Sequence, residues 1–180
     1  IAWSASHDRN NFGLSMDLKR KAISKLSKYA RVFISSENKL PPDLEKYQLQ
    51  IKPEEMHNVL SHAELFFGES CTMAVEAAIL GTPSIHVSTY AKDLGNFDEL
   101  NRKYKLLKFS DCGKEGLNFA IKLIKNPKSK KKWLKRAKIL IQDKIDGQDV
   151  YYLFRNMLLI LSMHLHHPTL IHVHFFLTHA

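Results

Sequence analysis

The stretch from Phe67 to Ile85 constrains the fold of this chain more than any other part of it. An apolar strand at 64–67 leads to Gly68, which permits a sharp turn. Small residues follow that can form one face of a helix, and Gly81 is placed to end this helix in the left-handed cap position. An apolar strand at 84–87 comes next. The pattern predicts two parallel strands joined by a right-handed helical crossover.

The start of this helix is suited to bind phosphate, because the first N–H groups of a helix lack internal partners and the helix dipole is positive there. Ser70 or Thr72 can cap the helix through its hydroxyl. Ser70, Cys71 and Thr72 are also small enough for a diphosphate to approach. Glu76 lies about one turn beyond Thr72, where its carboxylate can accept from two ribose hydroxyls. A capped helix with a solvated Glu76 explains the same spacing without any ligand.

Two short motifs resemble the nucleotide-sugar-binding signature of proteins with the GT-B fold. They are Glu76-Ala77-Ala78 and Gly81-Thr82-Pro83-Ser84-Ile85. In that family the glutamate holds the ribose and the preceding loop holds the diphosphate. The resemblance therefore implies these roles for Glu76 and for the loop that includes Glu69. Retaining members carry two glutamates with seven residues between them, whereas Glu69 and Glu76 have six between them, so that pattern is not matched.

The sequence is more similar to the UDP-N-acetylglucosamine 2-epimerases and to an uncharacterised family, a domain of unknown function, among the GT-B-like proteins. The similarity to the uncharacterised family rests on Met56-His57-Asn58-Val59-Leu60, Ala63-Glu64-Leu65 and Gly68-Glu69. The resemblance extends over roughly residues 1–158. The Thr-Glu-Arg-Pro-Glu signature of true epimerases is absent, which argues against a straightforward epimerase.

The resemblance implies ligand contacts at three more places. The segment 5–13 is similar to the His-Arg-Arg-Glu-Asn-Phe-Gly segment of the epimerases, which implies that His7 and Arg9 contact the diphosphate or the sugar. In related folds the base stacks on a strand-to-helix turn, which in this chain includes Ile51 and Met56. The sugar-contacting loop of the family falls near 88–97, and this makes Asn96 a candidate.

Hydrophobic periodicity divides the rest of the chain into strands and helices. We expect strands at 31–36, 47–51 and 106–109, and helices at 14–29, 53–62, 100–104, 114–125, 130–145 and 149–161, with a short helical piece near Leu44. The residues expected to face inward are Leu18, Ala22, Ile23, Leu26 and Tyr29 in the first helix, and Leu117, Ala120, Ile121 and Ile124 in the helix at 114–125. This alternation predicts the α/β class, with a Rossmann-like parallel sheet of about five or six strands flanked by helices, as in one half of a GT-B fold.

Residues 1–160 are expected to form one nucleotide-sugar-binding domain, followed by an atypical tail at 161–180. The last seventeen residues hold six of the ten histidines, but their intervals match no four-ligand zinc site. The chain also begins without methionine. We therefore expect a fragment whose N-terminal domain is missing.

Cysteine content and charge limit the partners of the chain. Its two cysteines have no paired spacing, so we expect a reducing, cytoplasmic location and no metal or other cofactor.

Nine Lys or Arg residues and no acid lie between Lys122 and Lys138, which matches the net charge of +9. This run predicts a solvated helix face or contact with an anionic membrane surface, which would make the protein peripheral to the membrane. Specific recognition of nucleic acid is not expected.

Taken together, these features predict the UDP-sugar-binding half of a glycosyltransferase-like protein. The helix dipole and nearby side chains would neutralise the departing diphosphate. Because the acceptor site and the general base would lie on the N-terminal domain, we expect this chain alone to be inactive. The alternatives are an epimerase-like isomerase, a non-catalytic nucleotide-sugar-binding module and a basic nucleic-acid-binding module.

Overall fold

The computed structural model of the protein describes residues 14–36, 39–88 and 98–144. Its elements are, in chain order, helix α1 (Met16–Leu26), the 3₁₀ turns η1 (Glu45–Tyr47) and η2 (Pro53–Glu55), helix α2 (Met56–His62), strand β1 (Phe66–Gly68), helix α3 (Cys71–Ile79), strand β2 (Ser84–Val87), the π-helical turn η4 (Glu99–Lys103), strand β3 (Leu107–Ser110), and helices α5 (Gly113–Ile124) and α6 (Ser129–Lys144). The predicted helix at 149–161 and the histidine-rich tail at 161–180 lie outside the described residues.

Three parallel strands form the sheet in the order β1-β2-β3. Phe66 of β1 lies opposite Ser84 of β2, and Ser84 lies opposite Leu107 of β3. Every residue of β1 and β2 is buried, as is typical of parallel strands that are covered on both faces. The predicted α/β fold with a Rossmann-like parallel sheet is therefore confirmed.

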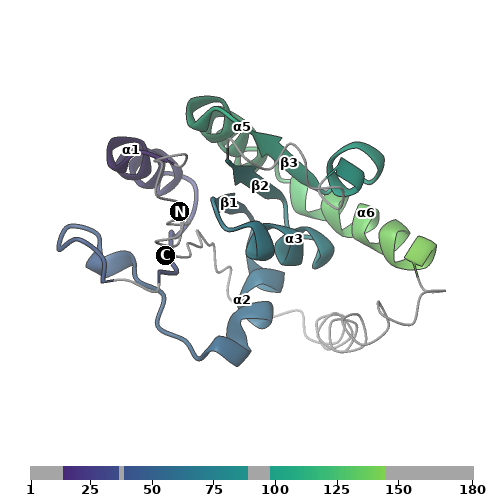
Figure 1. Ribbon diagram of the computed structural model, residues 1–180, viewed down its shortest axis with the longest axis horizontal. Helices are drawn as coiled ribbons and strands as arrows, with labels where there is room; N and C mark the ends of the chain where they lie inside the picture. Colours follow the sequence, from purple (N-terminus) through teal and green to yellow (C-terminus); the bar gives the residue numbers. More distant parts are fainter. Residues whose placement is uncertain (1–13, 37–38, 89–97, 145–180) are drawn as a thin grey trace.

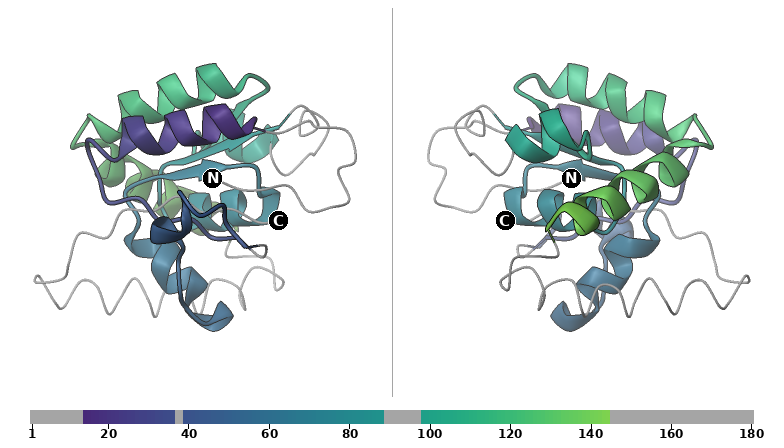
Figure 2. Two further views of the ribbon diagram at one scale, coloured as in Figure 1. Left: turned by 90° about the vertical axis from the view of Figure 1, so that its left-hand side faces the viewer. Right: turned by 90° about the vertical axis from the view of Figure 1, so that its right-hand side faces the viewer.

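Helices cover both faces of this sheet (Figure 1). The layer formed by α1 and α5 lies on one face, while α2, α3 and α6 lie on the other, as both views in Figure 2 also show. A side chain at Gly116 of α5 would place its Cβ 2.9 Å from Cγ2 of Val87 in β2. This glycine therefore lets α5 approach the sheet closely.

The crossover from β1 through α3 to β2 follows the sequence prediction closely. The predicted small apolar face is buried and consists of Met73, Ala74, Ala77 and Ala78. Gly81 has the predicted left-handed conformation, with φ of 76°. A Cβ at Gly81 would also lie 3.0 Å from the Cα of Leu134, so the same glycine allows α6 to pack against the end of α3.

The strands predicted at 31–36 and 47–51 are wrong as continuous strands. They meet only at one parallel bridge, in which Ile34 pairs with Gln48. The Ile34 N–H donates to the Tyr47 carbonyl and the Leu49 N–H donates to the Ile34 carbonyl, both at 2.7 Å. The two segments do not pair as strands beyond this bridge, because the 3₁₀ turn η1 ends directly before Gln48 and the next 3₁₀ turn, η2, begins at Pro53. The sheet of the described residues consequently has three strands rather than five or six.

The first helix is shorter than predicted, and Tyr29 does not face the core. Helix α1 ends at Leu26, and the Ser27 hydroxyl donates to the Ile23 carbonyl at 2.7 Å across its last turn. Tyr29 lies beyond this end and is 44% exposed. In α5 the inward residues are Gly116, Leu117, Ala120 and Leu123, while the predicted Ile121 and Ile124 are only partly buried.

The other predicted helices are present with slightly different ends. Pro53 occupies the first position of η2, which continues directly into α2, and Leu60 of α2 is fully buried. The helical piece near Leu44 is η1, and the helix at 100–104 is the single π turn η4.

A buried lysine connects α6 to the other elements on its face of the sheet. The Lys130 ammonium donates to the Ser61 carbonyl at 2.8 Å and to the Thr82 hydroxyl at 2.5 Å. Burial lowers the pKa of Lys130 to about 7, and attraction to Glu64 acts in the opposite direction. One member of the basic run at 122–138 is therefore a structural group.

Candidate functional site

The carboxyl ends of the three strands meet at one edge of the sheet, and two helices begin at this edge. Strand β1 ends at Gly68 and leads to α3, whereas β3 ends at Ser110 and leads to α5. Ligands of open parallel sheets bind outside this edge. The residues that follow the strands are therefore the first place to look for a site.

Ser70 caps the start of α3. Its backbone is extended, and its hydroxyl oxygen accepts from the Met73 N–H at 3.4 Å. Because Ser70 is the cap, the exposed hydroxyl of Thr72 is not needed for this purpose. The N–H groups of Cys71 and Thr72 lie in the first turn, where a helix provides no acceptors. Burial raises the pKa of the Cys71 thiol, so this cysteine is not an activated nucleophile.

Glu76 lies on α3 beside the first turn of α2. Its carboxylate is 3.5 Å from Nε2 of His57, and its side chain is 25% exposed. His57 follows Met56, which is partly buried against the core, and Ile51 precedes the same helical segment and is also half-buried. The structure thus brings the predicted ribose carboxylate next to the segment that was predicted to hold the base.

Glu69 has a different environment. Its carboxylate is almost fully buried and lies 3.1 Å from the Lys19 ammonium of α1. It also accepts from the Leu14 N–H. Burial raises the pKa of Glu69 and lowers that of Lys19, while their mutual attraction acts against both shifts. The pair connects α1 to the loop after β1, so the carboxylate that was predicted to contact a ligand has protein partners in the structure.

His86 belongs to β2, the middle strand of the sheet, between β1 and β3. It pairs in register with Gly68 and Phe109, and its ring centroid is 6.1 Å from that of Phe109. Burial lowers the pKa of His86 to about 4, although a hydrogen bond with the Gly68 backbone acts in the opposite direction. The imidazole is therefore neutral near pH 7 and is buried within the sheet.

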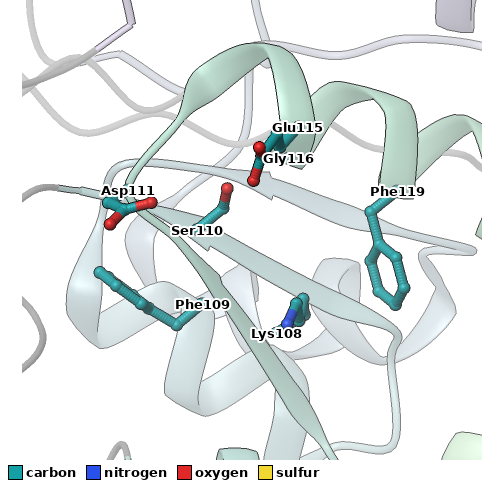
Figure 3. A pocket seen from close by; sticks show the side chains of 7 residues that line it. All are labelled: Lys108, Phe109, Ser110, Asp111, Glu115, Gly116 and Phe119. Atoms are coloured by element: carbon teal, nitrogen blue, oxygen red, sulfur yellow. The ribbon is translucent and has the colours of Figure 1, made fainter.

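A separate hollow of about 360 Å³ lies between β3 and α5 (Figure 3). Figure 3 shows the Ser110 side chain directed toward α5 and the Phe119 ring extending from α5 toward the strand. Two carboxylates, those of Asp111 and Glu115, line this hollow, and none of the predicted site residues does. Because carboxylates repel phosphate, the start of α3 is the better candidate for an anion.

Sequence reasoning missed two partners of the site glutamates, Lys19 and His57. A signal for Lys19 exists, because it lies three residues before Ala22 and seven before Leu26, on the inward face of α1. His57 carries no comparable signal, since its proximity to Glu76 depends on how α2 packs against α3.

Some predictions cannot be placed. His7, Arg9 and Asn96 lie outside the described residues. Within 14–36, 39–88 and 98–144, no group of three or more His, Cys, Asp or Glu side chains could hold a metal ion. In the same part of the chain, no helix has the length and apolar character needed to cross a membrane.

Comparison with known proteins gives one result. A family described as "Protein of unknown function (DUF354)" has a model that matches residues 13–147. Searches of curated proteins and of solved structures gave no significant match.

Proposed function

The chain belongs to the DUF354 family, and we propose that it is the UDP-sugar-binding half of a glycosyltransferase-like protein with a GT-B fold. One observation carries the proposal. The first turn of α3 follows a buried parallel strand, and the part-exposed Glu76 on the same helix lies beside the first turn of α2. A diphosphate and a nucleoside could therefore bind side by side on this unit.

Each part of the ligand has a proposed partner. The N–H groups of Cys71 and Thr72, together with the exposed Thr72 hydroxyl, bind the diphosphate. The Glu76 carboxylate accepts from the ribose hydroxyls, and the base packs on the segment from Ile51 to Met56. Glu69 supports the loop through Lys19 instead of contacting the ligand. Contacts from His7, Arg9 and Asn96 stay predictions of the family resemblance.

This arrangement suits glycosyl transfer because the helix start stabilises the diphosphate as it leaves the sugar. The acceptor and the general base are proposed to come from a second domain. We therefore expect the purified chain to bind UDP but not to release it from a UDP-sugar. Release of UDP above the level of a Glu76→Ala control would contradict this division of roles.

The proposed relation to GT-B proteins leaves one further reaction class for the same site, an epimerase-like isomerase. In such an enzyme the diphosphate would bind in the same way, and only the fate of the sugar would differ. NMR of a UDP-N-acetylhexosamine incubated with the full-length protein separates the two, since an isomerase yields a second hexosamine signal without an acceptor.

Calorimetric titration of UDP and of uridine tests the phosphate-binding part of the proposal. We expect Thr72→Ala to weaken UDP binding by roughly tenfold and to leave uridine binding unchanged, because the lost hydrogen bond addresses phosphate. Ser24→Ala, which removes an exposed hydroxyl from α1, is the matched control. A wild-type chain that does not bind UDP, or an equal loss for uridine, would contradict the proposal.

A further inference from the structure

We propose that α6, together with a basic hollow at its start, docks on an anionic phospholipid membrane. The hollow has a volume of about 620 Å³ and is bordered by η4, β3, α5 and α6. It lies at the end of the sheet where β3 begins and α5 ends, opposite the edge with the candidate site. The inference does not depend on the proposed function.

Six basic side chains line the basic hollow, and its lining includes no acidic residue. They are Arg102, Lys105, Lys108, Lys122, Lys132 and Arg136. Arg102 is compensated by Asp98 at 2.6 Å, and Arg136 is held in place by donating to the Lys105 carbonyl at 2.7 Å. Such a concentration of positive charge in a concave surface attracts a compact anion such as the phosphate of a lipid headgroup.

The exposed face of α6 continues this positive surface. The side chains of Lys131, Lys132, Lys135 and Lys138 are exposed, whereas Trp133, Ala137, Leu140 and Ile141 are buried against the protein. The right-hand view of Figure 2 shows α6 at the front of the molecule, with nothing covering it among the described residues. Positive charge therefore extends from the basic hollow along an open helix face.

Ile139 distinguishes this face from an ordinary solvated one. It is 52% exposed and lies four residues after Lys135, on the same side of the helix. On an anionic membrane, an exposed aliphatic side chain among lysines inserts into the interface while the lysines contact the headgroups.

The distribution of acids and aromatic rings also favours a membrane. Glu99 binds Lys144 at 3.0 Å, and Asp143 lies 3.5 Å from Lys103, so these two acids neutralise lysines near the far end of α6. A single-stranded nucleic acid needs exposed rings for stacking, but Trp133 is only 6% exposed. Nucleic acid would also make no use of Ile139.

Co-sedimentation of the full chain with vesicles tests the charge requirement. We expect binding to vesicles that contain phosphatidylglycerol, no binding to phosphatidylcholine alone, and weaker binding as salt is added. Replacing Lys132, Lys135 and Lys138 by Ala should weaken binding by about a hundredfold, since each lysine near an anionic surface contributes about fivefold. The control replaces the exposed Lys21, Lys28 and Lys46, which lie on α1, just after α1 and in η1, away from the basic hollow, and it should bind like the wild type.

A second set of measurements distinguishes binding to a membrane from binding to other anions. Ile139→Ser should weaken vesicle binding by roughly fivefold because insertion of the side chain is lost. Tyr29→Ser, which removes an exposed large apolar side chain beyond the end of α1, should not weaken it. Duplex DNA, single-stranded RNA and inorganic phosphate are titrated in parallel. Absence of vesicle binding, an unchanged Ile139→Ser variant, or tighter binding of a nucleic acid or free phosphate than of vesicles would overturn the proposal.

Discussion

Two glutamates on either side of the start of α3 have opposite environments. Glu69 is only 4% exposed and is held by the buried Lys19, whereas Glu76 is 25% exposed and lies near His57, which is itself open to solvent. A buried charge destabilises the fold unless it keeps its partner. A part-exposed contact between polar side chains contributes little to stability and can be exchanged for contacts to a ligand. Glu69 therefore supports the crossover from β1 through α3 to β2, and Glu76 is available for binding.

The two threonines of the same crossover repeat this contrast. Thr82 is fully buried, donates to the Leu60 carbonyl at 2.7 Å and accepts from Lys130. Thr72 is exposed on the first turn of α3. Buried anchors therefore lie at both ends of this strand-helix-strand segment, with the exposed Thr72 and the part-exposed Glu76 between them. Substitutions of the anchors should affect stability, and substitutions of Thr72 and Glu76 should affect the proposed binding.

The largest effect is expected from Lys19→Met. It leaves the Glu69 carboxylate buried without its partner, so the free energy of unfolding at neutral pH should fall by about 3–5 kcal/mol. Urea denaturation followed by circular dichroism measures the change. The double variant Lys19→Met/Glu69→Leu removes both charges and should recover most of the loss. Arg20→Met, which breaks the exposed pair with Asp43, is the control and should cause only a small change.

The free energy of unfolding of Lys19→Met should also depend on pH. Burial already raises the pKa of Glu69 in the folded protein above the usual 4.5, and without Lys19 it rises further. The folded state then binds a proton that the unfolded chain has released, so stability falls as pH rises through this window. The deficit of Lys19→Met relative to the wild type should shrink when denaturation is repeated near pH 4. A deficit that is equal at both pH values would mean that Glu69 does not cause it.

A smaller effect is expected from Thr82→Val. The change removes the hydroxyl that donates to Leu60 and leaves the Lys130 ammonium with one acceptor fewer, which should cost about 1–3 kcal/mol. Affinity for UDP should stay the same, because Thr82 is buried at the far end of α3. A loss of UDP affinity without a loss of stability would reverse the roles of the two threonines.

The smallest change in stability is expected from Ser70→Ala. The variant loses the hydroxyl that caps α3 and should be less stable by about 1 kcal/mol. Thr72→Ala serves as the comparison and should leave the melting temperature nearly unchanged. If Thr72→Ala were instead the less stable variant, Thr72 would be the true cap.

Local signals made most of this unit predictable from sequence. The glycine at position 81, the small apolar face of α3 and a hydroxyl at the helix start each fix the backbone over a few residues, and the structure has all of them. The strands predicted at 31–36 and 47–51 failed because pairing depends on how distant segments meet. The environments of Glu69 and Glu76 were unpredictable for the same reason, since Lys19 and His57 come from other helices.

The central claim is that Glu76 binds the ribose while Glu69 only supports the site. Calorimetric titration of UDP into the wild type, Glu76→Gln and His57→Ala tests it most directly. We predict that Glu76→Gln lowers UDP affinity by about ten- to a hundredfold, because charge-assisted bonds to the ribose are lost. His57→Ala removes the imidazole beside Glu76 but keeps the carboxylate, and should bind UDP like the wild type. Equal UDP affinity in the wild type and Glu76→Gln would contradict the claim.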